Sequence, residues 1–172
     1  MLENLNSLDH PGCPFGSTAD VLAAVSSVNR PQPRINLDLH HTQIGEGHLV
    51  RWCEKCLPWI GEVRTDDNPG RSEPGTGEIN YPSVARVLDA MSYLGPIGME
   101  AFSSSDADTT PEAFRAAFTI NKAWWLAVSM PKVGNIDRSA MTNIVIQLVS
   151  LNPGGQPSMF KMAVSVDPCE EC

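Results

Sequence analysis

The fold is decided by Leu37-Asp38-Leu39-His40-His41 and by the later loop Pro69-Gly70-Arg71-Ser72-Glu73-Pro74-Gly75-Thr76-Gly77-Glu78-Ile79-Asn80-Tyr81. The first stretch is a short apolar run that ends in a carboxylate and an imidazole. The second is a turn-rich loop with charges at fixed offsets, and a helix pattern follows it at once. A strand that ends in an acid and a histidine, followed by a helix and another strand, is how an α/β barrel presents metal ligands at one rim.

Strand-like and helix-like patterns alternate around these two stretches. Strands are expected near residues 2–5, 35–41, 61–67 and 96–102, and helices over 21–28, 47–60, 82–93 and from 110 to about 130. This alternation predicts a parallel sheet with covering helices. A closed eight-stranded barrel needs about 250 residues. Residues 1–130 are therefore expected to form about four βα units, which is a partial (β/α)8 TIM barrel with open sheet edges.

The last part of the chain, residues 131–172, breaks this rhythm. Residues 143–151 and 159–166 each alternate apolar and polar side chains, and Asn152-Pro153-Gly154-Gly155 lies between them. The pattern predicts a divergent tail that forms an antiparallel β-hairpin, or one without a stable partner.

Composition and charge argue against several classes of function and location. The formal net charge of −8 argues against a nucleic-acid or anionic-membrane surface. No apolar run is long enough to cross a bilayer, and the first residues lack the basic and apolar regions of a secretory signal. Five cysteines, an odd number, argue against a complete disulfide framework. The chain is therefore expected to be cytoplasmic, with reduced thiols.

Three carboxylates lie at or near the ends of predicted strands: Glu3, Asp38 and Glu100. Barrel enzymes place catalytic groups there. Carboxylates together with imidazole suit Mg²⁺ or Mn²⁺, and a neighbouring Glu can move a proton. The alternative is that such residues are helix caps or solvated groups.

Four motifs in order carry a resemblance. They are the two stretches quoted above, Gly98-Met99-Glu100, and Glu3-Asn4-Leu5-Asn6 with Asp9-His10-Pro11-Gly12. Together they resemble the xylose isomerase-like TIM barrel superfamily, and within it the hydroxypyruvate isomerase-like members. The resemblance covers about residues 2–119 and corresponds to the C-terminal half of that barrel.

The resemblance implies a metal-dependent sugar or keto-acid isomerase. Glu3, Asp38 and Glu100 would be ligands of a divalent metal, Mg²⁺ or Mn²⁺. Glu3 and Glu100 would also be the acid/base pair that moves a proton through an enediol(ate). For hydroxypyruvate the product would be tartronate semialdehyde.

The resemblance also implies residues that contact the small hydroxy-carbonyl substrate. These are Asp9, His41 and Arg71. His40 is instead interpreted as a strand-end residue.

The chain departs from the family pattern at Arg64, which stands where a His or Gln ligand is usual. An arginine cannot ligate a cation and would repel it, so the metal site is weakened. Glu62 points to the same face as Arg64, and the two can pair. The missing half of the barrel and the unfamiliar tail are further departures.

These departures leave an alternative of a different class, a truncated and catalytically inactive barrel fragment that acts as a binding module or has no activity. A homo-oligomer of half-barrels could close the cavity. A related metal-dependent endonuclease ranks last because the chain is acidic.

Two CxxC pairs, Cys53-Glu54-Lys55-Cys56 and Cys169-Glu170-Glu171-Cys172, could share zinc, but helical cysteines with apolar neighbours are usually core residues.

Overall fold

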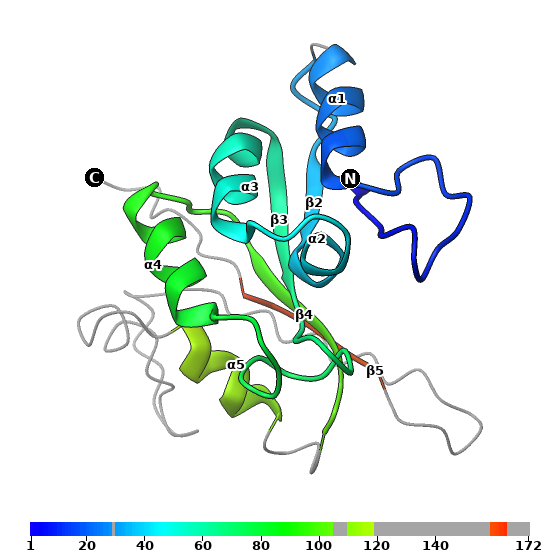
Figure 1. Ribbon diagram of the computed structural model, residues 1–172. Coiled ribbons are helices and arrows are strands. Elements are labelled where there is room, and N and C mark those ends of the chain that lie inside the picture. The colour runs from blue at the N-terminus through cyan, green and yellow to red at the C-terminus, as the bar shows by residue number, and fades with distance from the viewer. Residues whose placement is uncertain (29, 105–109, 119–158, 165–172) are drawn as a thin grey trace, which may run out of the picture.

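A computed structural model of the chain describes residues 1–28, 30–104, 110–118 and 159–164 (Figure 1). Four parallel strands lie side by side in chain order: β1 (Leu2–Glu3), β2 (Ile35–Asp38), β3 (Ile60–Thr65) and β4 (Ile97–Phe102). The helices between and after them are α1 (Thr18–Val28), α2 (Leu39–Gly45), α3 (Leu49–Cys56), α4 (Tyr81–Ala90) and α5 (Thr110–Phe118). This arrangement confirms the predicted partial (β/α)8 barrel.

A fifth strand, β5 (Met159–Val164), pairs with β4 in the antiparallel sense. It comes from the region expected to be a divergent tail, and it covers the edge of β4 that the sequence alone left open. The other half of the predicted hairpin, residues 143–151, lies outside the described residues. So do Trp124-Trp125, the end of the helix expected to reach residue 130, and the second CxxC pair.

Several predicted element bounds are wrong, and two of them have a clear structural cause. The strand expected over residues 35–41 ends at Asp38, because the Asp38 side chain accepts a hydrogen bond from the backbone N–H of His41 and so caps α2. His40 and His41 therefore lie on a helix. The helix expected to reach Ile60 ends at Cys56, and a 3₁₀ turn (Leu57–Trp59) follows. Pro58 has no N–H with which to continue the helix.

The core lies between the outer face of the sheet and the helices. Its strand residues are Ile35, Leu37, Val63, Met99 and Ala101, each at most 1% exposed. Cys53 and Cys56 of α3 are also fully buried and are free thiols. This confirms that the first CxxC pair packs in the core. No helix in the described ranges is long and apolar enough to span a membrane.

Candidate functional site

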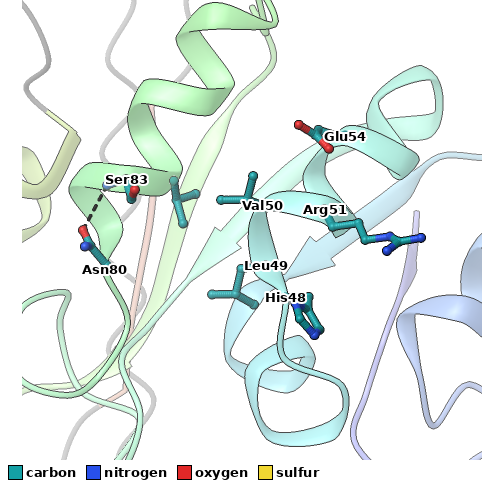
Figure 2. Close-up of a pocket in the computed structure, with 8 residues that line it drawn as sticks. His48, Leu49, Val50, Arg51, Glu54, Asn80 and Ser83 are labelled. Carbon is teal, nitrogen blue, oxygen red and sulfur yellow. Dashed lines mark hydrogen bonds between the residues drawn. The ribbon is translucent and has the colours of Figure 1, made fainter.

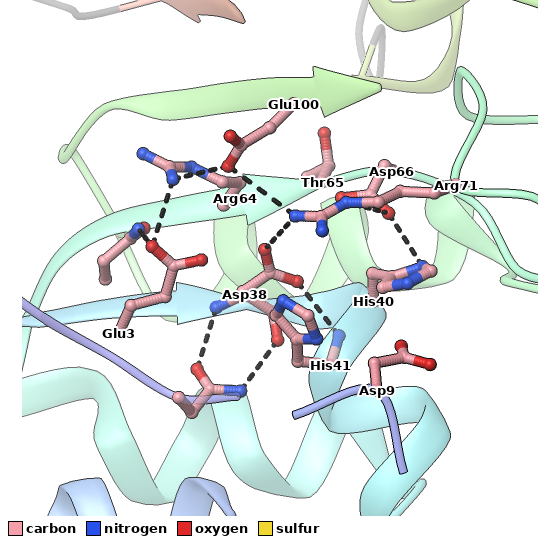
Figure 3. Close-up of polar contacts among 12 residues, drawn as sticks. Glu3, Asp9, Asp38, His40, His41, Arg64, Thr65, Asp66, Arg71 and Glu100 are labelled. Carbon is pink, nitrogen blue, oxygen red and sulfur yellow. Dashed lines mark hydrogen bonds and ion pairs between the residues drawn. The ribbon is translucent and has the colours of Figure 1, made fainter. Parts of the chain in front are cut away.

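The inner face of the sheet is polar, in contrast to its apolar outer face. Asp38 of β2 and Arg64 of β3 are paired in register, so their side chains share one face. Arg64 is also paired with Gly98 of β4, two residues before Glu100. Glu3 of β1 is in register with Asn36, two residues before Asp38 on β2. The parallel sheet thus gathers the three predicted carboxylates around Arg64 (Figure 3).

Arg64 bridges three carboxylates. Its Nη1 lies 2.7 Å from Oε2 of Glu100 and 3.2 Å from Oε2 of Glu3, and its Nη2 lies 3.5 Å from Oε1 of Glu62. The expected contact between Glu62 and Arg64 is present, but it is the longest of the three. Burial alone would lower the pKa of Arg64, and the charges of Glu3, Glu100 and Glu62 raise it above its ordinary value. The guanidinium is therefore a fixed positive charge.

Asp38 is fully buried beside these groups. One oxygen caps α2, and the other lies 3.7 Å from Nη2 of Arg71. Asn4 holds the Asp38 backbone from β1, since its Oδ1 accepts from the Asp38 N–H at 2.9 Å and its Nδ2 donates to the Asp38 carbonyl at 3.0 Å. Burial, and then repulsion from Asp66, raise the pKa of the Asp38 carboxyl well above its ordinary value.

The loop after β3 places Arg71 opposite β2 and β4. Asp67 fixes this loop, because its carboxylate accepts hydrogen bonds from the backbone N–H groups of Gly75 at 2.8 Å and Ile79 at 3.0 Å. Nε of Arg71 lies 3.8 Å from Oδ1 of Asp66, and its Nη2 lies 3.7 Å from both Oδ2 of Asp38 and Oε2 of Glu100. Arg71 adopts a left-handed backbone conformation, with φ of 52°. Arg64 and Arg71 therefore approach the same oxygen of Glu100.

His41 is buried on α2 and lies against the loop that follows β1. Its Nδ1 is 2.7 Å from Nδ2 of Asn6, which also donates to Oδ2 of Asp9 at 2.8 Å. Burial, followed by the charge of Arg71, lowers the pKa of His41 to about 3. The structure therefore links the predicted residues His41 and Asp9 through an amide that the sequence had not singled out.

His40 and Asp66 are site neighbours that sequence reasoning missed. Nδ1 of His40 lies 2.8 Å from Oδ1 of Asp66, and both side chains are buried. The sequence predicts a strand-end residue at His40, but α2 begins before it and turns it toward the loop after β3. The signal that could have found Asp66 is its position directly after a strand, where barrels place functional groups.

Two groups of side chains in the described residues could hold a cation. They are Glu3, Asp38 and His41, and Asp9, His40 and His41, each with ligand atoms within 4.8 Å of one another. Glu100 belongs to neither group. The predicted trio of Glu3, Asp38 and Glu100 is thus brought to one place, but with Arg64 between two of its members.

A separate open groove of about 520 Å³ lies between α3 and α4. Figure 2 shows Leu49 and Val50 of α3 facing the start of α4, where Asn80 accepts a hydrogen bond from the backbone N–H of Ser83. None of the three predicted carboxylates, Glu3, Asp38 and Glu100, lines this groove. The candidate site is therefore the polar inner face of the sheet.

Comparison with known proteins places this chain among barrel proteins. Residues 1–122 match the model of the xylose isomerase-like TIM barrel family. Hydroxypyruvate isomerase of Escherichia coli strain K12 is 35% identical over 100 residues, which are 58% of this chain and 39% of that protein. A 2-oxo-tetronate isomerase of Pectobacterium atrosepticum is also 35% identical over 100 residues, 58% of this chain and 38% of that protein. The chain spans about two fifths of the length of these relatives.

Solved structures show the same fold. The crystal structure of a family 2 AP endonuclease from Brucella melitensis superposes with a TM-score of 0.62 and 33% sequence identity. The match covers 66% of this chain and 44% of the other.

Proposed function

Because the chain belongs to the xylose isomerase-like TIM barrel family, we propose that it acts as a sugar or keto-acid isomerase of the hydroxypyruvate type. The isomerase relatives support this proposal, as does one feature of the site. Glu3 and Glu100 come from strands at opposite sides of the parallel sheet, and both reach the same nitrogen of Arg64. Two carboxylates on either side of one cation are suited to passing a proton between neighbouring carbons of a small substrate.

In the proposed reaction one of the two carboxylates removes the proton from the carbon that bears the hydroxyl. The enediolate that forms carries negative charge on oxygen, which a nearby guanidinium stabilises. The proton returns to the neighbouring carbon, and the hydroxyl proton passes to the former carbonyl oxygen, so atoms and electrons balance without an added reductant or oxidant. With hydroxypyruvate as substrate the product is tartronate semialdehyde.

Three other residues are proposed to orient the substrate. Arg71 supplies a second positive charge near Glu100, and a guanidinium suits the carboxylate of a keto acid. His41 is buried beside Arg71, and Asp9 is exposed on the loop that follows β1. These assignments come from the family resemblance, and the proximity of the residues supports them.

A divalent metal bound by both Glu3 and Glu100 does not fit the site as these residues stand. The oxygens that would face the metal accept hydrogen bonds from Arg64. Glu3, Asp38 and His41 remain near one another, but Arg64 contacts Glu3 in that group as well. No step of the proposed reaction therefore passes through a metal.

The proposal is tested by incubating the chain with hydroxypyruvate in deuterium oxide and following the proton spectrum. We expect conversion to tartronate semialdehyde with deuterium incorporation. Removal of a general acid or base typically costs about 10²- to 10⁴-fold in rate, so we expect losses of this size in Glu3→Gln and Glu100→Gln. Glu54→Gln, at an exposed position on α3, is the matched control and should keep full activity.

A folded but inactive chain would contradict the proposal. If the folded chain neither converts hydroxypyruvate nor exchanges its protons, the inactive-fragment alternative replaces the isomerase proposal. Light scattering on the same sample separates a monomer from a homo-oligomer, and we expect activity only where subunits together close the cavity.

A further inference from the structure

We propose that the Arg64 guanidinium is the built-in cation of this site and takes the place of a divalent metal between Glu3 and Glu100. The consequence for substrate, that a small keto acid is held without a metal, rests on the proposed function. The identity of the cation does not rest on it, because it follows from the contacts of Arg64 alone.

A cation shared by Glu3 and Glu100 would have to lie where their two Oε2 atoms converge. Nη1 of Arg64 already occupies that point, at 3.2 Å and 2.7 Å. Glu62 holds the other end of the guanidinium through Nη2. Three carboxylates from three strands therefore fix the arginine in this position.

The charge at this point also disfavours a divalent ion. Arg64 is largely buried, with its side chain 14% exposed, so its charge is poorly screened by solvent. Arg71 adds a second positive charge 3.7 Å from the same Glu100 oxygen. A divalent ion at this point would be repelled by both guanidinium groups. Arg64 cannot lose its proton to relieve the repulsion.

A guanidinium has more N–H donors than the contacts with Glu3, Glu62 and Glu100 use. The remaining donors suit the carbonyl or carboxylate oxygen of an anionic substrate. Arg64 can thus supply the positive charge that polarises a carbonyl, while Glu3 and Glu100 stay within reach to move the proton.

Calorimetric titration of the full chain with Mn²⁺ tests the identity of the cation. We expect no stoichiometric binding in the wild type and clear binding in Arg64→Gln, which removes the charge and offers an amide oxygen. The double variant Arg64→Gln with Glu100→Gln should lose that binding, by at least about tenfold in affinity. Arg64→Lys, which keeps the charge, should bind no better than the wild type.

Two results would overturn the proposal. One is Mn²⁺ binding by the wild-type chain that Glu100→Gln abolishes. This result does not depend on whether any Arg64 variant folds. The other is a folded Arg64→Gln chain, with wild-type circular dichroism, that gains no Mn²⁺ affinity.

An activity assay with a chelator separates this proposal from the proposed function. Hydroxypyruvate turnover that survives EDTA supports both. Turnover that requires added metal overturns the role of Arg64 and leaves the isomerase standing. Absence of turnover, together with Mn²⁺ binding only in Arg64→Gln, overturns the isomerase and leaves the assignment of the cation intact.

Discussion

Asn6 fixes the proton of His41 on one particular ring nitrogen. Oδ1 of Asn6 accepts hydrogen bonds from the backbone N–H groups of residues 8 and 9, at 3.1 and 2.8 Å. The amide nitrogen must therefore face His41, whose Nδ1 lies 2.7 Å away. Because an N–H can only donate, Nδ1 of His41 is the acceptor and the proton is on Nε2. His41 is thus a neutral hydrogen-bond donor.

The first prediction is that Asn6→Asp reverses this arrangement. A carboxylate in place of the amide accepts a proton from Nδ1 and favours the charged ring. We expect the His41 pKa to rise from about 3 toward its ordinary value of 6.5, with Nδ1 protonated. Long-range ¹H–¹⁵N spectra of the histidine side chains, recorded as a function of pH, measure both changes.

Asn80→Asp is the control for this experiment. Asn80 caps α4 by accepting from the backbone N–H of Ser83, and an aspartate does so equally well. His41 should be unchanged in this variant. A wild-type spectrum with the proton of His41 on Nδ1 would contradict the assignment.

The second prediction concerns Glu73, which joins the loop after β3 to the segment after β4. Its carboxylate accepts from the Ser104 backbone N–H at 3.0 Å and from the Ser104 hydroxyl at 2.6 Å. Although burial raises the pKa of Glu73, these hydrogen bonds lower it below its ordinary value of 4.5. The folded state therefore binds fewer protons than the unfolded state, and the stabilisation present above pH 4.5 is lost as the pH falls through the folded pKa.

Glu73→Gln should destabilise the chain by about 1–2 kcal/mol at pH 7. The difference from the wild type should shrink as the pH is lowered from 5 to 3. Urea unfolding at a series of pH values measures it. Glu78→Gln changes an exposed carboxylate in the same loop and should show neither effect. A Glu73→Gln difference that stays constant with pH would refute the assigned role.

The third prediction concerns Tyr81, the first residue of α4. Its hydroxyl donates to the Asp66 carbonyl at 2.6 Å and accepts from the Asp66 N–H at 3.1 Å, and the side chain is fully buried. Tyr81→Phe leaves two buried backbone groups without partners, so we expect a loss of about 1–3 kcal/mol in the free energy of unfolding.

Tyr93→Phe provides the comparison for Tyr81. The Tyr93 hydroxyl donates to the Pro96 carbonyl at 2.9 Å, and the side chain is only half-buried. Its removal should cost less than that of the Tyr81 hydroxyl. Equal losses in the two variants would mean that Tyr81 does not support Asp66.

The sequence predicted the parallel order of the sheet because strand and helix periodicities alternate strongly up to β4. It also predicted the contact between Glu62 and Arg64, since side chains two apart on a strand share a face. It did not predict that Arg64 reaches Glu3 and Glu100. That contact depends on the register of four strands, which periodicity does not specify.

The amides and buried acids of the site were also beyond the reach of sequence patterns. Asn4 hydrogen-bonds to Asp38, which lies 34 positions further along the chain, and Asn6 to His41, which lies 35 positions further along. Their role exists only once β1 and β2 are paired. The sequence predicts a strand at His40 because it follows a short apolar run, and that run outweighs the competing signal, the helix cap made by Asp38.

The last prediction tests whether Asn4 ties β1 to β2. Asn4 is fully buried and holds both backbone groups of Asp38, and its Nδ2 also donates to Oγ1 of Thr42 at 3.1 Å. In Asn4→Ala the buried N–H of Asp38 loses its acceptor, which costs about 1–3 kcal/mol, and a small cavity forms. Chemical unfolding should show this loss. Gln43→Ala, which breaks only an exposed contact with Glu78, should stay within about 0.5 kcal/mol of the wild type. Equal stability of the two alanine variants would mean that the backbone pairing of β1 alone holds this corner of the sheet.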